Sequence, residues 1–158
     1  MSPRPTALGE PKFFVDKEQK LFLDRRFRDA ARQQPDLRVL RTLLLGFGGV
    51  HMVAHPGPDP DLPRLIGAGL VMTGPVMLRI MKKNGCHENV SRIWASKQHK
   101  IAGIGTGYSL SDDGLWRQHS WGIRRNGIIE TTSLRVKYFG VLLQNQYADL
   151  FAMANLAG

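Results

Sequence analysis

Residues 84–94 read NGCHENVSRIW and contain Cys86, the single cysteine of the 158-residue chain. Val90, Ile93 and Trp94 recur at positions i, i+3 and i+4, the spacing of one apolar face of a short helix. The Asn-Gly pair ahead of the cysteine is typical of a helix boundary, so we expect the thiol in the first helical turn. Unpaired backbone N–H groups and the helix dipole favour a nucleophilic thiolate there. The stretch therefore predicts a reactive thiol, with a small buried hydrophobe as the alternative.

Length and composition indicate one ordinary globular domain. Hydrophobic residues make up 42% and charged residues 22% of the chain, which is typical of neither disorder nor fibres. A single cysteine excludes an intramolecular disulfide and agrees with a reducing compartment. The start of the chain has no signal-peptide pattern, and the longest uncharged apolar run, residues 65–78, is broken by glycine and proline. We therefore expect a soluble, cytoplasmic protein that does not span a membrane.

The formal net charge is +9 and the sequence pI is about 10.2. Such a charge promotes binding to nucleic acid, anionic membranes or acidic proteins. Arginines gather in the first quarter of the chain, at positions 25, 26, 28, 32, 38 and 41. Basic and aromatic residues do not alternate there as a stacking platform for nucleic acid requires. A solvated helix face is favoured over a nucleic-acid surface, and the partner expected for these basic helices is an acidic protein.

The N-terminal part predicts an arm and two helices. Residues 1–16 carry several prolines and are expected to be extended, and residues 17–32 show a helical apolar stripe. Asp36 is a candidate N-cap for a second helix beginning at Leu37. Residues 56–63 contain four prolines and predict a loop. We therefore divide one domain into an N-terminal helical extension (residues 1–55), this loop, and an α+β core (residues 64–158).

The core is expected to begin with helices and continue as an antiparallel meander. Residues 64–83 predict apolar helical structure interrupted at Gly74-Pro75. Four apolar runs then follow, separated by turns; they cover residues 101–110, 115–123, 128–133 and 137–143. A short helix over residues 147–156, with Leu150, Phe151 and Ala154 inward, is expected to close the chain.

Two patterns that resemble cofactor sites do not qualify as such. His51 and His55 have the i, i+4 spacing of a zinc pair, but position 52 is methionine and no nearby carboxylate supplies a third ligand. We interpret them as closing a helix before Pro56. The glycines at 103, 105 and 107 lack the spacing of a dinucleotide-binding loop. The sequence therefore predicts no metal and no cofactor.

A reactive thiol needs a base and a polar residue that orients the base. His119 lies between aromatic residues in the expected strand 115–123, and Glu130 is the single acid of the next apolar run. A two-residue turn at Asn126-Gly127 would separate the two by roughly 13 Å along the ribbon. A four-residue loop closed by Gly122 and Gly127 would place them directly opposite each other. We therefore expect the wider loop.

These motifs resemble the papain-like thiol superfamily, in its small transglutaminase-like and NlpC-type branches. The match covers about residues 84–143: Cys86 opening a helix, then the segments 119–121 (HSW), 130–132 (ETT) and 138–141 (YFGV). The resemblance implies an α+β, papain-like core in which the helix bearing the nucleophile packs on an antiparallel sheet. It also implies cleavage or transfer of acyl groups from amides or esters. Glu130 departs from the commoner Asp, Asn or His, and no oxyanion-hole Gln precedes the cysteine.

On the residues and the resemblance together, Cys86 is the candidate nucleophile, His119 the general base and then acid, and Glu130 the residue that orients the imidazole. The Cys86 N–H is the candidate oxyanion donor. Candidate oxyanion or substrate-binding residues are Asn89, Gln118 and Trp121. His87 and Glu88 are expected to face solvent. The predicted function is a cysteine-dependent hydrolase or acyltransferase acting on an amide or (thio)ester; the alternative is a non-catalytic basic module that binds nucleic acid or an acidic protein.

Overall fold

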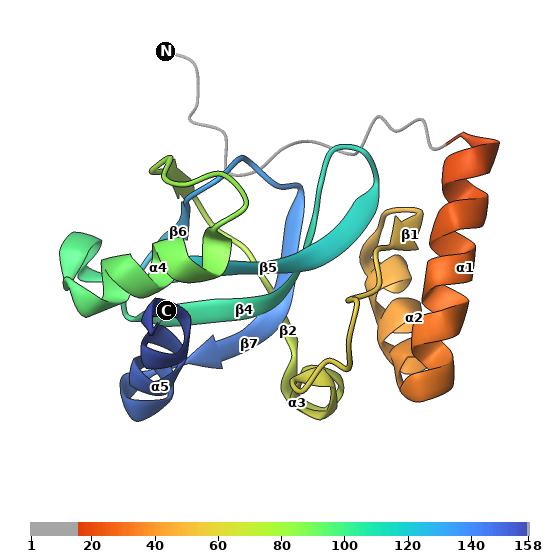
Figure 1. The fold of residues 1–158 in the computed structure, drawn as a ribbon. Coiled ribbons are helices and arrows are strands. Elements are labelled where there is room, and N and C mark those ends of the chain that lie inside the picture. The colour runs from red at the N-terminus through yellow and green to blue at the C-terminus, as the bar shows by residue number, and fades with distance from the viewer. Residues whose placement is uncertain (1–15, 158) are drawn as a thin grey trace, which may run out of the picture.

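The computed structural model describes residues 16–157 (Figure 1). The helices are α1 (Lys17–Gln33), α2 (Leu37–Phe47), α3 (Leu62–Ala68), α4 (Cys86–Ala95), the 3-10 turn η1 (Gln98–Lys100) and α5 (Asn145–Leu156). The strands are β1 (His51–Met52), β2 (Leu70–Met72), β3 (Val76–Leu78), β4 (Gly103–Leu110), β5 (Leu115–Arg124), β6 (Gly127–Glu130) and β7 (Lys137–Leu143). The arm expected over residues 1–16 lies, except for Asp16, outside the described residues.

The strands form one mixed sheet in the order β2-β7-β4-β5-β6-β3. Most neighbours are antiparallel, whereas β3 runs parallel to β6, and β1 runs parallel to β5 beside the main path. Figure 1 shows the sheet curling, with α4 and α5 together at one end and α1 and α2 side by side at the other. The α+β class expected from the sequence is confirmed.

One face of the sheet packs against the helices and forms the main core. Ile104, Tyr108 and Trp116 point to this face and are fully buried. Leu40 and Leu44 of α2 belong to the same buried cluster, as do residues of α3, α4 and α5. Since α2 contributes fully buried leucines to this cluster, the N-terminal helices share the core of the sheet and have none of their own.

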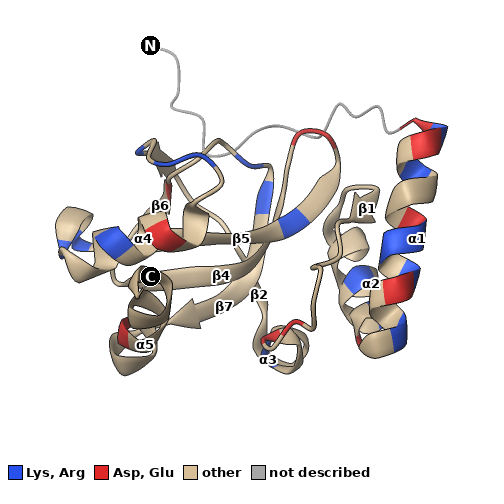
Figure 2. Cartoon of the chain, viewed as in Figure 1, with Lys and Arg blue, Asp and Glu red and all other residues tan. Residues whose placement is uncertain are grey.

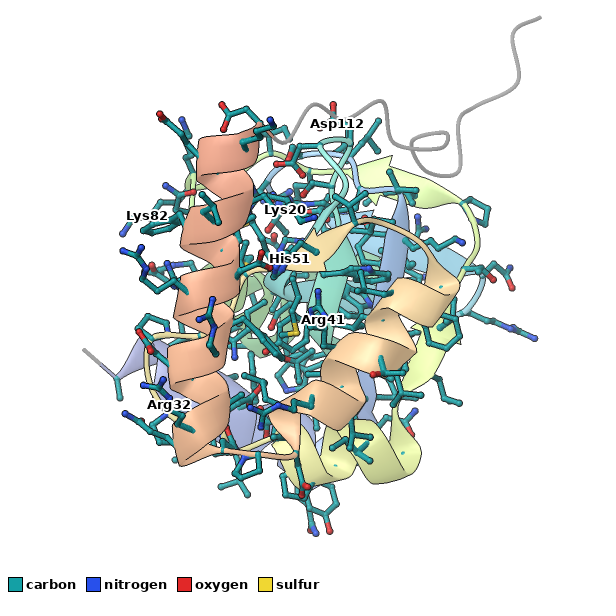
Figure 3. The ribbon with its side chains drawn as sticks, turned by 90° about the vertical axis from the view of Figure 1, so that its right-hand side faces the viewer. Lys20, Arg32, Arg41, His51, Lys82 and Asp112 are labelled. Atoms are coloured by element: carbon teal, nitrogen blue, oxygen red, sulfur yellow. The ribbon has the colours of Figure 1, made fainter. Side chains whose placement is uncertain are left out.

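Polar contacts also hold α1 to the rest of the structure, and Figure 3 labels two of the residues involved, His51 and Arg41. Asp24 Oδ1 lies 2.7 Å from Nε2 of His51 at the start of β1, and Arg26 Nε donates to the carbonyl of Ala54 at 2.8 Å. The guanidinium of Arg41 on α2 lies 5.2 Å from the ring centroid of Phe27 on α1, within the range of a cation–π contact.

The other face of the sheet encloses a second, smaller core made of Trp121, Ile128 and Tyr138. Two glycines let the large indole of Trp121 lie directly on the backbone. A Cβ at Gly105 would lie 2.1 Å from the indole Nε1, and one at Gly140 would lie 2.9 Å from its far edge. These glycines therefore let the indole ring approach the strand backbone closely, a common role of glycine within a strand. The aromatic layer thereby lies next to His119.

The segment between the proline-rich loop and Cys86 differs from the expectation. The prediction of helices over residues 64–83 is wrong beyond Ala68, because residues 70–72 and 76–78 are the short edge strands β2 and β3. They pair with β7 and β6, which lie far away in the sequence. A three-residue apolar strand has no period that distinguishes it from a helical turn. The loop itself ends at Asp61, since α3 begins at Leu62 with a proline in its first turn.

Two further expectations need correction. His51 and His55 do not share a helix, because α2 ends at Phe47 and His51 begins β1. The expected meander holds for β4, β5 and β6 only. Strand β7 returns to the far edge of β4, and the free side of β6 is taken by β3. The six residues between β6 and β7 give the chain the length needed for this return.

Helix α5 buries the expected face only in part: Phe151 packs against the main core as expected, but Leu150 and Ala154 do not. Ala148 and Ala152 are buried, whereas Leu150 is 61% exposed and Ala154 is exposed. The small side chains at i and i+4 let α5 approach α4 closely. Phe151 completes the contact, with its ring centroid 6.0 Å from that of His87 on α4. No helix within residues 16–157 is both long enough and apolar enough to cross a membrane.

The shared core predicts that the extension and the sheet unfold together. Leu44→Ala should lower the free energy of unfolding by about 2–5 kcal/mol, because it leaves a cavity in the main core. Val39→Ala on the same helix, at a position 46% exposed, should change it by less than about 0.5 kcal/mol. Urea unfolding followed by tryptophan fluorescence and by far-UV circular dichroism tests this. A helical transition separate from the fluorescence transition would contradict it.

Candidate functional site

Cys86 begins α4, as the sequence predicts. The loop that precedes Cys86 is held in place by the side chain of Asn89. Asn84 adopts a left-handed conformation, φ 60°, which asparagine tolerates better than most residues. Asn89 Nδ2 donates to the carbonyl of Lys82 at 2.8 Å and to Thr131 Oγ1 at 3.2 Å. The amide thus ties the loop before the cysteine to the chain that follows β6. The backbone N–H groups of residues 86–88 precede the first bonds inside the helix and are free of intrahelical acceptors.

His119 lies in the middle of β5 and is 2% exposed. Its Nε2 lies 2.7 Å from Glu130 Oε1. The ring stacks on the indole of Trp121, with centroids 6.1 Å apart and planes at 25°, and contacts the ring of Tyr138 at 6.3 Å. Because Nε2 is taken by the carboxylate, Nδ1 is the nitrogen left for the thiol of Cys86. The aromatic layer and the carboxylate therefore fix both the position and the orientation of the imidazole.

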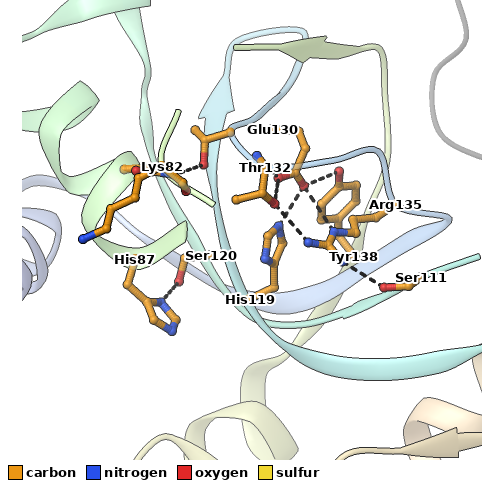
Figure 4. A network of polar contacts seen from close by, with 11 residues as sticks. Lys82, His87, Ser111, His119, Ser120, Glu130, Thr132, Arg135 and Tyr138 are labelled. Atoms are coloured by element: carbon orange, nitrogen blue, oxygen red, sulfur yellow. Dashed lines mark hydrogen bonds and ion pairs between the residues drawn. The ribbon is translucent and has the colours of Figure 1, made fainter. Parts of the chain in front are cut away.

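The carboxylate of Glu130 is completely buried and has a full set of donors (Figure 4). Tyr138 donates its hydroxyl to Oε1 at 3.0 Å. The backbone N–H and the hydroxyl of Thr132 both donate to Oε2 at 3.0 Å. Arg135 Nε lies 3.9 Å from Oε1 and adds a positive charge. Buried charges are costly unless they are hydrogen-bonded and paired, so these contacts explain how an ionised carboxylate is stable here.

The geometry of the His119–Glu130 pair differs from both hairpins considered above. Gly122 pairs with Ile129 and Arg124 with Gly127, so a two-residue turn of Arg125-Asn126 joins the strands. Continued by one position, this register puts Glu130 opposite Trp121 and diagonal to His119. Diagonal neighbours on one face are roughly 7–8 Å apart at the backbone, within reach of long side chains. The expectation that the pair requires a four-residue loop is therefore wrong.

Electrostatics favour an ion pair between Cys86 and His119. Burial opposes ionisation of the thiol, but hydrogen bonding and charge attraction from His119, together with a hydrogen bond from the Ser120 backbone, lower the pKa of Cys86 below its ordinary value. Burial likewise opposes a charged imidazole, but contacts with Cys86 and Glu130 raise the pKa of His119. Burial alone would raise the pKa of Glu130, but the hydrogen bond and charge of His119, the Thr132 N–H and the charge of Arg135 together lower it. These directions favour thiolate, imidazolium and carboxylate in a row.

The hydroxyl of Tyr138 supports an ionised Glu130. Burial and the adjacent carboxylate of Glu130 raise the pKa of Tyr138. The phenol therefore stays protonated and donates to Glu130 throughout the neutral range. A carboxylate that accepts from a phenol, a hydroxyl and a backbone N–H is held in its ionised form.

Cys86 and His119 line the same cavity, which measures about 690 Å³. Gln118 and His87 also line it, and Ile80 and Met81 give it an apolar side. Its charged lining residues are all cationic: Lys83, Arg117 and Arg135. Asp113 neutralises part of this charge through a bidentate pair with Arg117. The thiol is thus partly buried at the wall of an open, mildly cationic cleft.

The structure treats the three candidate substrate-binding residues differently. Gln118 lines the cleft beside His119. Asn89 is 1% exposed and its amide donates to two protein acceptors, so it holds the loop and does not face the cleft. Trp121 is fully buried and supports the imidazole from behind. Asn89 and Trp121 are therefore corrected from substrate contacts to positioning residues.

His87 is a site residue that the sequence interpretation missed. The expectation that it faces solvent is wrong, because it is part-buried, lines the cleft and has Nδ1 2.6 Å from Ser120 Oγ. Ser120 Oγ in turn lies 2.8 Å from Thr106 Oγ1. Burial and the charge of His119 lower the pKa of His87, so its imidazole is neutral at pH 7. Glu88, as expected, lies at the surface and pairs with Arg92 and Lys82.

The hydroxyl residues Thr106 and Ser120 are the sequence feature that could have indicated the role of His87. Thr106 and Ser120 are polar residues that pair directly across β4 and β5 on the face toward the main core. A polar residue at such a position needs a buried partner. Only the packing of α4 on β5 identifies that partner as His87.

Metal ligation receives no support from the described part of the chain. Within residues 16–157, no three His, Cys, Asp or Glu side chains are arranged to hold a metal ion. His51 bonds to Asp24 and His55 to the backbone of Gly57. Both histidines thus make local structural contacts.

Comparison with protein-family models, with curated proteins and with solved structures gives no match to this chain. The interpretation of the site therefore rests on its geometry and chemistry.

The lowered pKa of the thiol predicts that Cys86 is alkylated at a lower pH than an ordinary thiol. The rate of iodoacetamide labelling of Cys86 should rise with pH through a midpoint below that of an ordinary thiol. His119→Ala removes the attraction that lowers the pKa, so the midpoint should move up and the rate at pH 6 should fall about tenfold or more, since each pKa unit changes the thiolate fraction tenfold. His99→Ala, which removes an imidazole outside the cleft, should leave the midpoint in place. Equal midpoints in all three proteins would refute the ion pair.

Proposed function

We propose that this protein is a cysteine-dependent hydrolase or acyltransferase that acts on an amide or (thio)ester through Cys86, His119 and Glu130. The observation that carries the proposal is the buried 2.7 Å contact between His119 Nε2 and Glu130 Oε1 beside a thiol of lowered pKa. A nucleophile, a base and an orienting group in this order match the requirements of covalent acyl transfer. Their position on the wall of an open cleft gives a substrate access.

In the first half of the reaction, the Cys86 thiolate attacks the carbonyl carbon of the substrate. A C–S bond forms, and the carbonyl π electrons move to the oxygen as an oxyanion. As the oxyanion collapses, the bond to the leaving group breaks and His119 gives its proton to the departing nitrogen, oxygen or sulfur. The products are a free amine, alcohol or thiol and an acyl thioester on Cys86. Glu130 keeps the ring aligned throughout and remains ionised.

In the second half, neutral His119 takes a proton from water or from an incoming nucleophile that attacks the thioester carbonyl. The C–S bond breaks, the sulfur leaves as thiolate, and the imidazolium next to it restores the starting ion pair. Water yields a free acid and therefore hydrolysis, whereas a bound amine yields a new amide and therefore acyl transfer. Both outcomes use the same residues, and the nucleophile that reaches the cleft decides between them.

The oxyanion is stabilised by the first turn of α4. The Cys86 N–H is free of an intrahelical acceptor, and the positive end of the helix dipole lies at the same place. Gln118 supplies a second polar group on the wall of the cleft. Donors placed in advance at this position contribute to catalysis because the charge develops only in the transition state.

The arrangement is similar to the papain-like thiol superfamily in the order of its parts. Helix α4 begins with the cysteine, and the histidine lies on β5, the second long strand after that helix. The adjacent strand β6 ends with the acid. In this proposal the fold is a small papain-like core to which the N-terminal helices are added.

A non-catalytic basic module, the alternative function, leaves the central features of the site without a role. Such a module does not require a fully buried carboxylate, an imidazole between it and a thiol, or an open cleft at the sulfur. Figure 2 also shows acidic residues interspersed with the basic ones along α1. The exposed charge of that helix is therefore mixed and suits a solvated surface.

An activated ester tests the proposed chemistry. The native protein, incubated with p-nitrophenyl acetate, should gain the mass of one acetyl group and release p-nitrophenolate in a burst, and Cys86→Ser should do neither. Glu130→Gln should slow acylation by about a hundredfold or more, because the base loses its orienting carboxylate. Glu88→Gln, a neutralised carboxylate on the surface of α4, serves as the matched control and should acylate at the native rate. Acetylation that persists in Cys86→Ser would refute the proposal.

A further inference from the structure

A second cavity, of about 710 Å³, lies at the other end of β6. One wall is the turn that follows α4 (Lys97–Lys100), and the other is the tip of the β5–β6 hairpin (Arg124–Gly127). Its floor is the start of β3, from Pro75 to Met77. We call it the basic cavity, because Lys97, Lys100, Arg124 and Arg125 line it. In Figure 2 the ribbon of the turn after α4 carries the blue of Lys and Arg.

The charges of the basic cavity are not compensated by the described chain. No Asp or Glu lines it. Within residues 16–157, none of the four cationic residues forms an ion pair, whereas Lys82, Arg92 and Arg117 elsewhere on the surface do. Like charges gathered around a hollow repel one another, and its walls concentrate the resulting field. The cavity therefore favours an anion of more than one charge.

Arg79 adds a fifth cation from beneath. Its Nη1 lies 2.9 Å from Nε2 of His99, which lines the cavity. Arginine can only donate, so His99 accepts at Nε2 and a neutral ring presents its proton at Nδ1. Arg79 Nε is buried and has no hydrogen-bond partner in the described chain. The imidazole is thus held in place as a neutral donor beside a cluster of cations.

The wall after α4 has an unusual backbone. Lys97, His99 and Lys100 all have positive φ angles, 56°, 58° and 49°, in a region that L-residues other than glycine rarely occupy. This conformation places three cationic or hydrogen-bonding side chains within four residues on one wall of the cavity.

We propose that the basic cavity binds a compact polyphosphate anion, a small molecule with two or three linked phosphate groups. Several cations around one hollow match the several charges of such a ligand, and guanidinium groups bind phosphate oxygens well. A concave site is typical of a small ligand. No Phe, Tyr or Trp lines the cavity, so a platform of such side chains for stacking the bases of single-stranded nucleic acid is absent from it.

The basic cavity is separate from the proposed catalytic cleft. The two have no lining residue in common. They lie at opposite ends of β6, which begins with Gly127 at the basic cavity and ends with Glu130, the buried partner of His119 at the cleft. Polyphosphate binding is therefore independent of the proposed thiol chemistry, and either can fail without the other.

Calorimetric titration of the full chain with inorganic triphosphate at physiological ionic strength tests the proposal. The expected result is saturable binding of one triphosphate per chain. Arg124→Gln/Arg125→Gln and Lys97→Gln/Lys100→Gln should each weaken binding about tenfold or more, the effect of losing one charge-assisted contact. The matched control is Arg28→Gln/Arg38→Gln, which removes the same charge from exposed positions on α1 and α2 and should change the affinity less than about twofold.

Three results would overturn the proposal: binding that does not saturate, an equal loss of affinity in the control variant, or a short DNA duplex that binds through the same four residues more tightly than triphosphate. Circular dichroism and the rate of iodoacetamide labelling at Cys86 establish that each variant is folded. A native labelling rate in a variant that no longer binds triphosphate separates this site from the thiol site.

Discussion

The hydrogen bond between His119 and Glu130 is the contact on which the organisation of this protein depends. It connects two strands diagonally, just where the backbone ladder between β5 and β6 ends. An ionised carboxylate buried this deeply is costly, by several kcal/mol per ion in real proteins, unless donors surround it. Tyr138, Thr132 and Arg135 meet that need from the segment that follows β6 and from β7. The buried carboxylate of Glu130 thus requires the chain that follows it to pass close by and supply these donors.

The rigidity of the imidazole originates in the sheet. Gly105 and Gly140 allow Trp121 to lie flat on the neighbouring strands, and Trp121 and Tyr138 then leave His119 a single orientation. Asn89 performs the equivalent task for Cys86 by fixing the loop that leads into α4. Positioning groups of this kind determine whether reactive residues lie at productive distances. Two residues expected to contact a substrate therefore hold the site together from inside the protein.

The basic residues that give the high net charge lie on two surfaces, one where acidic residues accompany them and one where they do not. Along α1 the basic residues alternate with Asp and Glu, and α1 is joined to the core by the contacts of Asp24 and Arg26. At the basic cavity four cations meet without any acid on its walls. The same overall charge of +9 thus gives a solvated helix in one place and a concentrated field in another. Only the second arrangement favours a particular ligand.

Helical and strand periodicity in the sequence determined α1, α2, α4 and the long strands β4, β5 and β7, because each extends over enough residues for its own pattern to show. The helix start at Cys86 was also a local property of the sequence. The chemistry of Cys86, His119 and Glu130 identified them as candidates from the sequence. Their proximity in space could not be read from it. That proximity depends on a two-residue turn, a diagonal contact and edge strands as short as β2 and β3, which are stabilised by partners far along the chain. The roles of Asn89, Trp121 and His87 were likewise decided by packing, since whether a polar or aromatic side chain meets a cleft or a buried neighbour is a property of the assembled layers.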